Sequence, residues 1–333
     1  MKKKRKIKKR IKLILLVGII SIGFISTKMV LQAQYDNNER ILEEQRILAE
    51  QQRIKEENEK KLQYEECLKN SEKNIISEHT NSQITNLEQT LKKYQISLNY
   101  YNFDYQFEFN YRENVSYYGA SLIKLLDALY LYENAVNGKI DLNSTITYEA
   151  KYQAGYSTYM QKKSFGTKVS LKDLVHYALN ASDNSAHFML FDYIGYNNLK
   201  NYARSIGLTT VLNRYDKFGE FTSVDAMKLI KYFYQFTSEH ELGKNLINSM
   251  NNDYYNSLII DNITTIHKYG LYDYFYHDIG IAYDESPYGI AILSQTGKNN
   301  YSTIFKNIHE QVNLINKSFI EDKKAECHRF IYS

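Results

Sequence analysis

The residue types and the spacing of Ser121 and Lys124 suggest a role in catalysis. They stand three positions apart at the start of an apolar run that reaches residue 132. A helix that begins near Ser121 would place both side chains on one face. Apolar residues surround the axis of this helix, which is typical of a buried helix. A lysine in a buried helix costs free energy unless it has a partner or a task. Ser121 is therefore a candidate nucleophile, and Lys124 is a candidate base.

Two further motifs could supply partners for this pair. Ser-Asp-Asn at residues 182–184 lies in a turn between two expected helices, 61 residues after Ser121. Asp and Asn are also ordinary helix N-cap residues, so this turn could be purely structural. Lys-Tyr-Gly at residues 268–270 ends an expected strand, where an edge lysine is common. Lys-Phe-Gly at residues 217–219 has the same Lys-x-Gly pattern, but it lies in a loop before a capped helix and is set aside.

In this order and in these contexts, the three motifs resemble the signature of class A β-lactamases and penicillin-binding proteins. The resemblance covers roughly residues 82–325. It implies an α+β fold, with an antiparallel five-stranded sheet flanked by helices and a second, all-helical lobe. It also implies a serine hydrolase that needs no cofactor and no metal. Its substrate would be a β-lactam or a peptidoglycan stem peptide.

The resemblance implies a catalytic role for several motif residues. Ser121 would attack the substrate carbonyl, and Lys124 would take the serine proton. Burial and the charge of Lys268 would lower the pKa of Lys124 enough for this task. Ser182 would relay the proton to the leaving nitrogen. These residues would form the catalytic part of the site.

The other motif residues would bind the substrate. Asn184 would hold the substrate amide, and Lys268 would attract the substrate carboxylate. Gly270 would let the strand approach the substrate closely. The N–H groups of Ser121 and Leu271 would form an oxyanion hole.

Two positions depart from the family pattern. Tyr269 stands where family members carry Thr or Ser, whose hydroxyl helps to hold the substrate carboxylate. Asp216 stands where class A β-lactamases carry the glutamate that activates the hydrolytic water. Its loop is short, because the next helix begins near Thr222, six residues later. Asp216 is a candidate deacylation base, Glu220 is a weaker one, and an ordinary surface acid is the alternative.

Three functions follow from these features. The first is a β-lactamase that hydrolyses the lactam amide through an acyl-enzyme on Ser121. The second is a D-alanyl-D-alanine carboxypeptidase or penicillin-binding protein that releases its acyl group slowly, which the short loop favours. The third is a catalytically weak module that binds the cell wall, which Tyr269 suggests.

The order of expected elements agrees with this fold. An antiparallel sheet made from both ends of the domain would face the helical lobe, with the site in the cleft between them. Within the lobe, Ser170, Thr222 and Ser238 each precede an acid by three residues and are expected to cap helices. The expected strands span residues 96–103, 105–111, 263–269, 279–283 and 288–294, and helices are expected at 82–94 and 303–323.

The N-terminal residues differ in character from the rest. Residues 2–12 carry nine Lys or Arg and no acid, and residues 13–25 are apolar and uncharged. We expect residues 1–34 to be an uncleaved signal anchor, with a cleaved signal peptide as the alternative. Residues 81–333 would then be an extracytoplasmic hydrolase domain. Residues 35–80 are charged and lack Pro and Gly, which favours a helical stalk over a disordered linker. Their broken heptad pattern leaves a weak stalk dimer open.

Charge and cysteine content exclude other classes. The net charge is +4, and removing the nine basic residues near the N-terminus leaves −5, so a nucleic-acid partner is not expected. Cys67 and Cys327 are far apart and lack a CxxC or a histidine at metal spacing. Neither a disulfide nor a zinc site is therefore expected. His176, His187 and His267 are expected to be structural or exposed.

Overall fold

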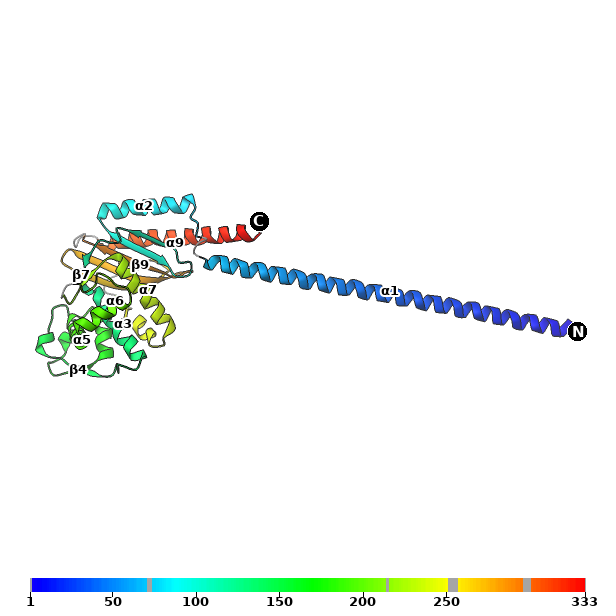
Figure 1. Ribbon diagram of the computed structural model, residues 1–333, viewed down its shortest axis with the longest axis horizontal. Coiled ribbons are helices and arrows are strands. Elements are labelled where there is room, and N and C mark those ends of the chain that lie inside the picture. The colour runs from blue at the N-terminus through cyan, green and yellow to red at the C-terminus, as the bar shows by residue number, and fades with distance from the viewer. Residues whose placement is uncertain (1, 71–73, 214–215, 251–256, 296–300, 333) are drawn as a thin grey trace. The chain divides into compact units, whose positions relative to one another are not determined.

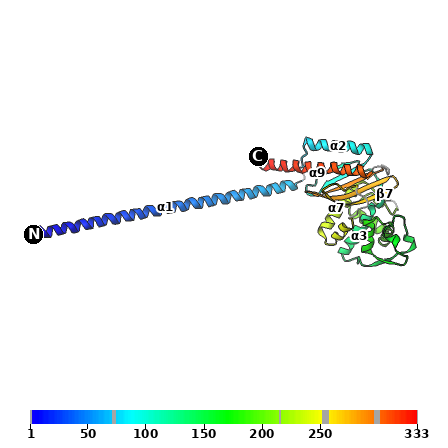
Figure 2. The same ribbon diagram turned by 180° about the vertical axis from the view of Figure 1, so that it is seen from behind.

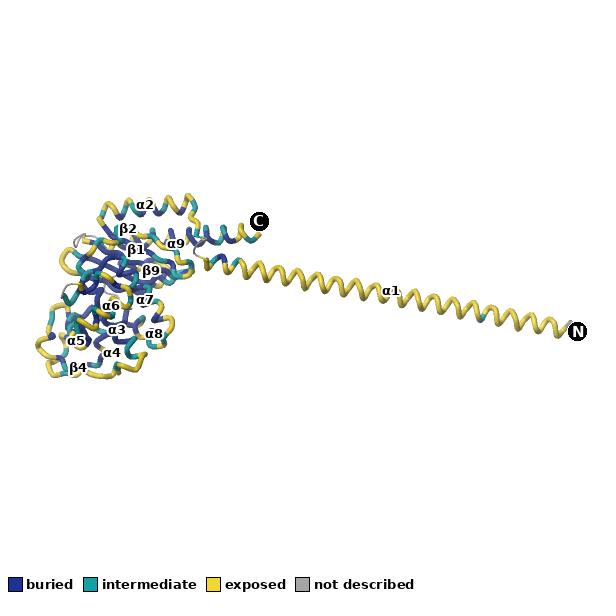
Figure 3. The backbone as a smooth tube through the Cα atoms, in the orientation of Figure 1, coloured by how far each residue is buried: buried dark blue, intermediate teal, exposed yellow. Residues whose placement is uncertain are grey.

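The computed structural model describes residues 2–70, 74–213, 216–250, 257–295 and 301–332. The chain forms two compact units, residues 1–66 and residues 67–333. Residues 2–66 of helix α1 (Lys2–Lys69) make up the described part of the first unit, and almost all of them are exposed (Figure 3). One 18-residue window of α1 has a mean hydropathy of 2.2, so the helix is long and apolar enough to cross a membrane. This fits a membrane anchor or a signal sequence.

The second unit contains a five-stranded antiparallel sheet in the order β2-β1-β9-β8-β7. The strands come from both ends of the unit, as the sequence predicts, and β7 lies at one edge. The fold prediction, an antiparallel five-stranded sheet with flanking helices, is confirmed. The strands are β1 (Ser97–Asn102), β2 (Glu108–Tyr111), β7 (Thr264–Tyr272), β8 (Phe275–Tyr283) and β9 (Tyr288–Ser294).

Different helices cover the two faces of the sheet (Figures 1 and 2). Helices α2 (Glu78–Tyr94) and α9 (Tyr301–Tyr332) pack on one face, and α7 (Ser223–Glu239) packs on the other. Strand β9 shows why this arrangement forms, because its side chains alternate between the faces. Ile290 and Ile292 join the cluster under α9, whereas Ala291 and Leu293 join the cluster of the helical lobe.

The helical lobe supplies the elements that surround Ser121. Ser170 and Thr222 accept hydrogen bonds from the backbone N–H three residues ahead, so both are confirmed as helix caps. The lobe contains α3 (Ile123–Val136), α4 (Leu171–Asn180), α5 (Asn184–Ile194), α6 (Tyr196–Ser205) and α8 (Gly243–Met250), three 3-10 turns, η2 (Ala120–Leu122), η3 (Ala150–Tyr152) and η4 (Met160–Lys162), and two strand pairs, β3 (Tyr117–Tyr118) with β6 (Glu220–Phe221) and β4 (Thr145–Thr147) with β5 (Lys168–Ser170).

The expected cap at Ser238 is wrong. Ser238 lies inside the last turn of α7, and its hydroxyl donates to the carbonyl of Tyr234 at 2.7 Å. Thr237 makes the same kind of bond to the carbonyl of Phe233 at 2.9 Å. Both hydroxyls bond to carbonyls of the preceding turn, so the Ser238 side chain is not available to cap the next helix, contrary to the expectation from the sequence.

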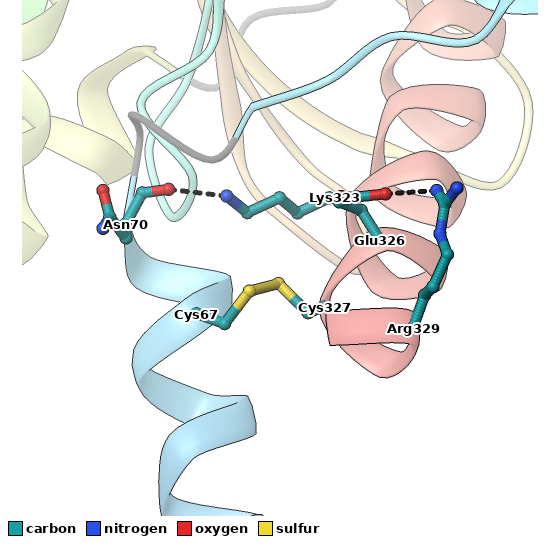
Figure 4. The surroundings of a disulfide bond; sticks show 6 residues. All are labelled: Cys67, Asn70, Lys323, Glu326, Cys327 and Arg329. Atoms are coloured by element: carbon teal, nitrogen blue, oxygen red, sulfur yellow. Dashed lines mark hydrogen bonds and ion pairs between the residues drawn. A yellow bond between two sulfur atoms is a disulfide. The ribbon is translucent and has the colours of Figure 1, made fainter. Parts of the chain in front are cut away.

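The expectation of no disulfide is also wrong. Cys67, in the last turn of α1, is bonded to Cys327 in α9, and their Cα atoms lie 5.7 Å apart (Figure 4). Beside the bridge, Lys323 donates to the carbonyl of Asn70 at 2.6 Å (Figure 4). The sequence carries no local signal for this disulfide, because the two cysteines are 260 residues apart and only folding brings them together.

Candidate active site

Ser121 lies in η2, where the chain passes from β3 into α3. The backbone just before Ser121 is closely packed. A Cβ on Gly119 would lie 2.5 Å from the ring of Phe221, so only glycine fits at this position. The next residue, Ala120, has a φ of 46°, a left-handed conformation that costs free energy in a non-glycine residue. The predicted helix start is therefore a 3-10 turn, and α3 begins two residues after Ser121. The Ser121 side chain is largely buried.

Lys124 is fully buried and lies against the candidate nucleophile. Its Nζ is 3.0 Å from Ser121 Oγ and 3.1 Å from Ser182 Oγ. It also donates to the carbonyl oxygen of Ser182 at 2.5 Å and to Asn184 Oδ1 at 2.6 Å. These last two atoms can only accept hydrogen bonds. In a neutral amine they would use both N–H groups, so its lone pair would face the two serine hydroxyls.

The surroundings of Lys124 favour the neutral amine. Burial lowers the pKa of Lys124 well below its ordinary value, and the charge of Lys268 lowers it further. Asp183 and Asp127 act in the opposite direction. Burial also lowers the pKa of Lys268, to about 7, against the effect of Asp278. A base must be unprotonated to accept a proton, so this environment suits the task proposed for Lys124.

The Ser-Asp-Asn turn has both a structural and a chemical part. Asp183 is the N-cap of α5, accepting from Ala186 N at 3.0 Å. Ser182 and Asn184, on either side of Asp183, both contact Lys124 Nζ. The backbone of Ser182 is in the left-handed region, with a φ of 54°. The amide of Asn184 donates in turn to the carbonyl of Gly155 at 2.9 Å, which fixes its orientation.

Strand β7 brings the third motif to the same place. Lys268 is fully buried, and its Nζ donates to Ser182 Oγ at 3.1 Å. A Cβ on Gly270 would lie 3.1 Å from the carbonyl oxygen of Gly119, so β7 and η2 are in close contact there. Tyr269 is buried, and Leu271, the next residue after Gly270, is half-buried. Ser121, Lys124, Ser182 and Lys268 are thus linked by direct side-chain contacts.

Asp216 lies in the short loop before β6, and one of its carboxylate oxygens accepts hydrogen bonds from that loop. Asp216 Oδ1 accepts from Phe218 N at 2.6 Å and from Gly219 N at 3.2 Å. The carbonyl of Gly219 in turn accepts from Gly119 N at 2.9 Å, so the loop touches the approach to Ser121. The weaker candidate, Glu220, pairs with Tyr118 in the β3–β6 ladder. The structure thus gives Asp216 a local role in shaping this loop.

One buried pair beneath the site was missed from the sequence. Asp127, one turn after Lys124 on α3, lies 2.5 Å from Nδ1 of His187 on α5, and both side chains are fully buried. Nε2 of His187 donates to the carbonyl of Lys217 at 2.9 Å. The three-residue spacing of Lys124 and Asp127 was the available signal, since it puts both on one face of α3.

A residue at the rim of the site was also missed. Tyr156 is 91 % exposed and has a φ of 58°. Its carbonyl accepts from the backbone N–H of Asn184 at 3.3 Å, which places it next to the Ser-Asp-Asn turn. An exposed aromatic ring in a constrained backbone conformation has no packing role here, but no motif in the sequence marks it.

The family model for the beta-lactamase enzyme family matches residues 79–317. This range includes all three motifs and most of the second unit. The chain belongs to the beta-lactamase enzyme family. A comparison of the sequence with curated proteins finds no match.

Solved structures show the same beta-lactamase fold. A mutant of PBP-A, solved as an acyl-enzyme complex with penicillin G, has a TM-score of 0.65 and 16 % identity, covering 71 % of this chain and 97 % of that one. The TLA-1 extended-spectrum beta-lactamase has a TM-score of 0.64 and 19 % identity, with coverages of 71 % and 99 %. A beta-lactamase from Sphaerobacter thermophilus DSM 20745 has a TM-score of 0.62 and 14 % identity, with coverages of 69 % and 95 %.

Proposed function

We propose that this member of the beta-lactamase family is a serine hydrolase that opens a β-lactam amide through an acyl-enzyme on Ser121. One observation carries the proposal: the fully buried amine of Lys124 lies 3.0 Å from Ser121 Oγ. A nucleophilic serine needs a nearby base to take its proton. Lys124 is such a base, because burial and Lys268 lower its pKa.

Acylation would proceed in two steps. Ser121 Oγ attacks the lactam carbonyl carbon while its proton moves to the lone pair of Lys124 Nζ, which gives a tetrahedral oxyanion. The carbon–nitrogen bond then breaks, and the leaving nitrogen receives a proton. Ser182 Oγ is the proposed relay, since it lies 3.1 Å from the Nζ atoms of both Lys124 and Lys268. The products are a serine ester and an amine.

The other residues of the site would bind the substrate. The N–H groups of Ser121 and Leu271 would stabilise the oxyanion, a contribution of about 3 kcal/mol for each such donor. Asn184 would hold the substrate amide, since its side chain is fixed between Lys124 and Gly155. Gly270 would allow the substrate to lie close to β7, next to Tyr269.

Deacylation is the step that separates two candidate functions. Hydrolysis of the ester needs a water activated by a base, and Asp216 is the candidate. Its Oδ1 already accepts two backbone N–H groups of its own loop. This favours the second candidate, a D-alanyl-D-alanine carboxypeptidase or penicillin-binding protein that acylates and releases slowly. Its substrate would be the peptidoglycan stem peptide.

The test uses the full-length protein in detergent with a fluorescent penicillin and a chromogenic cephalosporin. We expect a covalent adduct on Ser121, located by peptide mass spectrometry, and its loss in Ser121→Ala. Ser144→Ala, at an exposed serine, is the matched control and should label like the wild type. Turnover of the cephalosporin supports a β-lactamase, and stable labelling without turnover supports the second candidate. Absence of any adduct, with these probes and with the methyl ester of the cephalosporin, would contradict both candidates and leave a wall-binding module.

The proposed location is extracytoplasmic. Residues 1–34 would anchor the protein in the membrane, residues 35–80 would form the stalk, and residues 81–333 would carry the hydrolase. Basic residues flanking an apolar segment stay on the cytoplasmic side, which directs the rest of the chain outward. The disulfide between Cys67 and Cys327 supports this assignment, since disulfides persist in oxidising compartments.

A further inference from the structure

The ammonium group of Lys268 is enclosed by groups of the protein itself. It donates to the carbonyl of Tyr269 at 2.9 Å and to Ser182 Oγ at 3.1 Å. The ring of Tyr269 lies beside it, with its centroid 4.2 Å from Nζ. An ammonium has three N–H groups, and a cation is attracted to the face of an aromatic ring. The two hydrogen bonds and the ring contact therefore occupy the three N–H groups with which Lys268 could bind a substrate anion.

Tyr269 is held in this position by burial. Only 7 % of its surface is exposed, and Lys268 is fully buried. A substrate carboxylate that approached the ammonium would have to displace the ring or one of the two hydrogen bonds. Burial also lowers the pKa of Lys268 to about 7, so part of the population is uncharged near neutral pH. Both effects weaken the attraction of Lys268 for an anion.

The other lysine of the site does not replace Lys268 as an anion receptor. Lys124 Nζ has four oxygen neighbours between 2.5 and 3.1 Å, on Ser121, Ser182 and Asn184. Within the described part of the site, these two lysines are the cations that contact the Ser-Asp-Asn turn. A carboxylate next to the reacting amide would thus lose its hydration without gaining a free charged donor from either of these two lysines.

Resting on the proposed acylation of Ser121, we propose that Tyr269 sets the substrate preference by disfavouring a free carboxylate beside the reacting amide. The site would then react better with acyl donors in which this carboxylate is neutral, as an ester or as a further amide bond. Of the activities named for the second candidate, this disfavours a D-alanyl-D-alanine carboxypeptidase, because a peptide substrate would be cut at an internal amide bond and not before a terminal residue. The specificity would come from the ring of Tyr269, which hinders the binding of a free carboxylate to Lys268.

The test compares one chromogenic cephalosporin as the free acid and as its methyl ester. The readout is the ratio of the second-order acylation rates of Ser121 for the two probes. We expect the wild type to react at least as fast with the ester. Tyr269→Thr should raise the acid-to-ester ratio roughly tenfold to a hundredfold, the scale of one hydrogen bond to a charged group. Tyr269→Phe keeps the ring over Lys268 and should keep the wild-type ratio.

The outcomes separate this inference from the proposed function. Wild-type preference for the free acid would overturn the role of Tyr269 while leaving acylation of Ser121 intact. An unchanged ratio in Tyr269→Thr would overturn it as well. The acylation rate of each variant with the ester shows whether its site is folded. If the Thr variant does not fold, the acid-to-ester ratio of the wild type alone tests the role of Tyr269. If neither probe acylates Ser121, the proposed function fails and this inference fails with it.

Discussion

Lys124 and Lys268 share one hydroxyl, since the Nζ atom of each lies 3.1 Å from Ser182 Oγ. A positive charge on Lys268 this close to Lys124 makes the protonated form of Lys124 less stable. The carbonyl of Ser182 and the amide oxygen of Asn184 then fix the orientation of the Lys124 amine. At the residue scale, the proposed chemistry depends on this distribution of charge.

Removing the charge of Lys268 should shift the pH dependence of acylation. In the wild type the charge of Lys268 lowers the pKa of Lys124. In Lys268→Met this effect is lost, so the pKa of Lys124 should rise. Because only neutral Lys124 accepts the proton, the acidic limb of the rate profile should move to higher pH. The measurement is the second-order acylation rate of Ser121 as a function of pH across this acidic limb.

Lys268→Arg is the matched control for this prediction, because it keeps the positive charge. Its acidic limb should stay close to that of the wild type even if the rate is lower. A limb that does not move in Lys268→Met would show that the charge of Lys268 does not control the base.

At the scale of elements, the buried Asp127–His187 pair joins α3, α5 and the loop of Asp216. Nδ1 of His187 meets the carboxylate on α3, and Nε2 donates to the carbonyl of Lys217. That loop also contacts the approach to Ser121 through Gly119 and Gly219. The pair therefore connects the floor of the site to the loop that carries the candidate deacylation base.

Breaking this pair should affect both stability and catalysis. Asp127→Leu leaves His187 without its buried partner, which should lower the free energy of unfolding by about 1–3 kcal/mol. The double variant Asp127→Leu/His187→Phe removes both polar groups and should recover most of this loss. Denaturant unfolding measures the change. Equal losses in the single and double variants would contradict a paired role.

The same variant gives a second readout at Lys124. Asp127 raises the pKa of Lys124, so Asp127→Leu should move the acidic limb of acylation to lower pH. This is the opposite direction to the shift expected for Lys268→Met. A purely structural defect would lower the rate without this shift.

The sequence predicted the sheet and the three motifs because each has a local signal. Strand alternation, capping residues and motif order depend on neighbours along the chain. The features that escaped prediction depend on the direction that a side chain takes in the folded chain. The ring of Tyr269 lies against its own neighbour Lys268, and the Asp216 carboxylate bonds to its own loop. Neither arrangement follows from residue type, because each is one of several directions that the side chain could take.

At the scale of the whole molecule, the disulfide joins the last turn of α1 to α9 near the C-terminus. It closes a loop of 260 residues that contains the whole proposed site. Hydrogen bonds hold the same junction, since Asp322 on α9 accepts from Ser77 N at 2.8 Å and from Thr80 Oγ1 at 2.6 Å. Family membership carries no information about this bridge, because the family model matches residues 79–317 and both cysteines lie outside that range.

Reduction of this bridge should lower stability without unfolding the protein. Cross-linking so long a loop restricts the unfolded chain, and the chain-entropy estimate is about 5 kcal/mol. Because the bonds of Lys323 and Asp322 remain, we expect the reduced protein to stay folded but to melt at a lower temperature. The double variant Cys67→Ser/Cys327→Ser should melt like the reduced wild type and should not respond to reductant. Two titratable thiols in exported protein, or one melting temperature with and without reductant, would contradict the bridge.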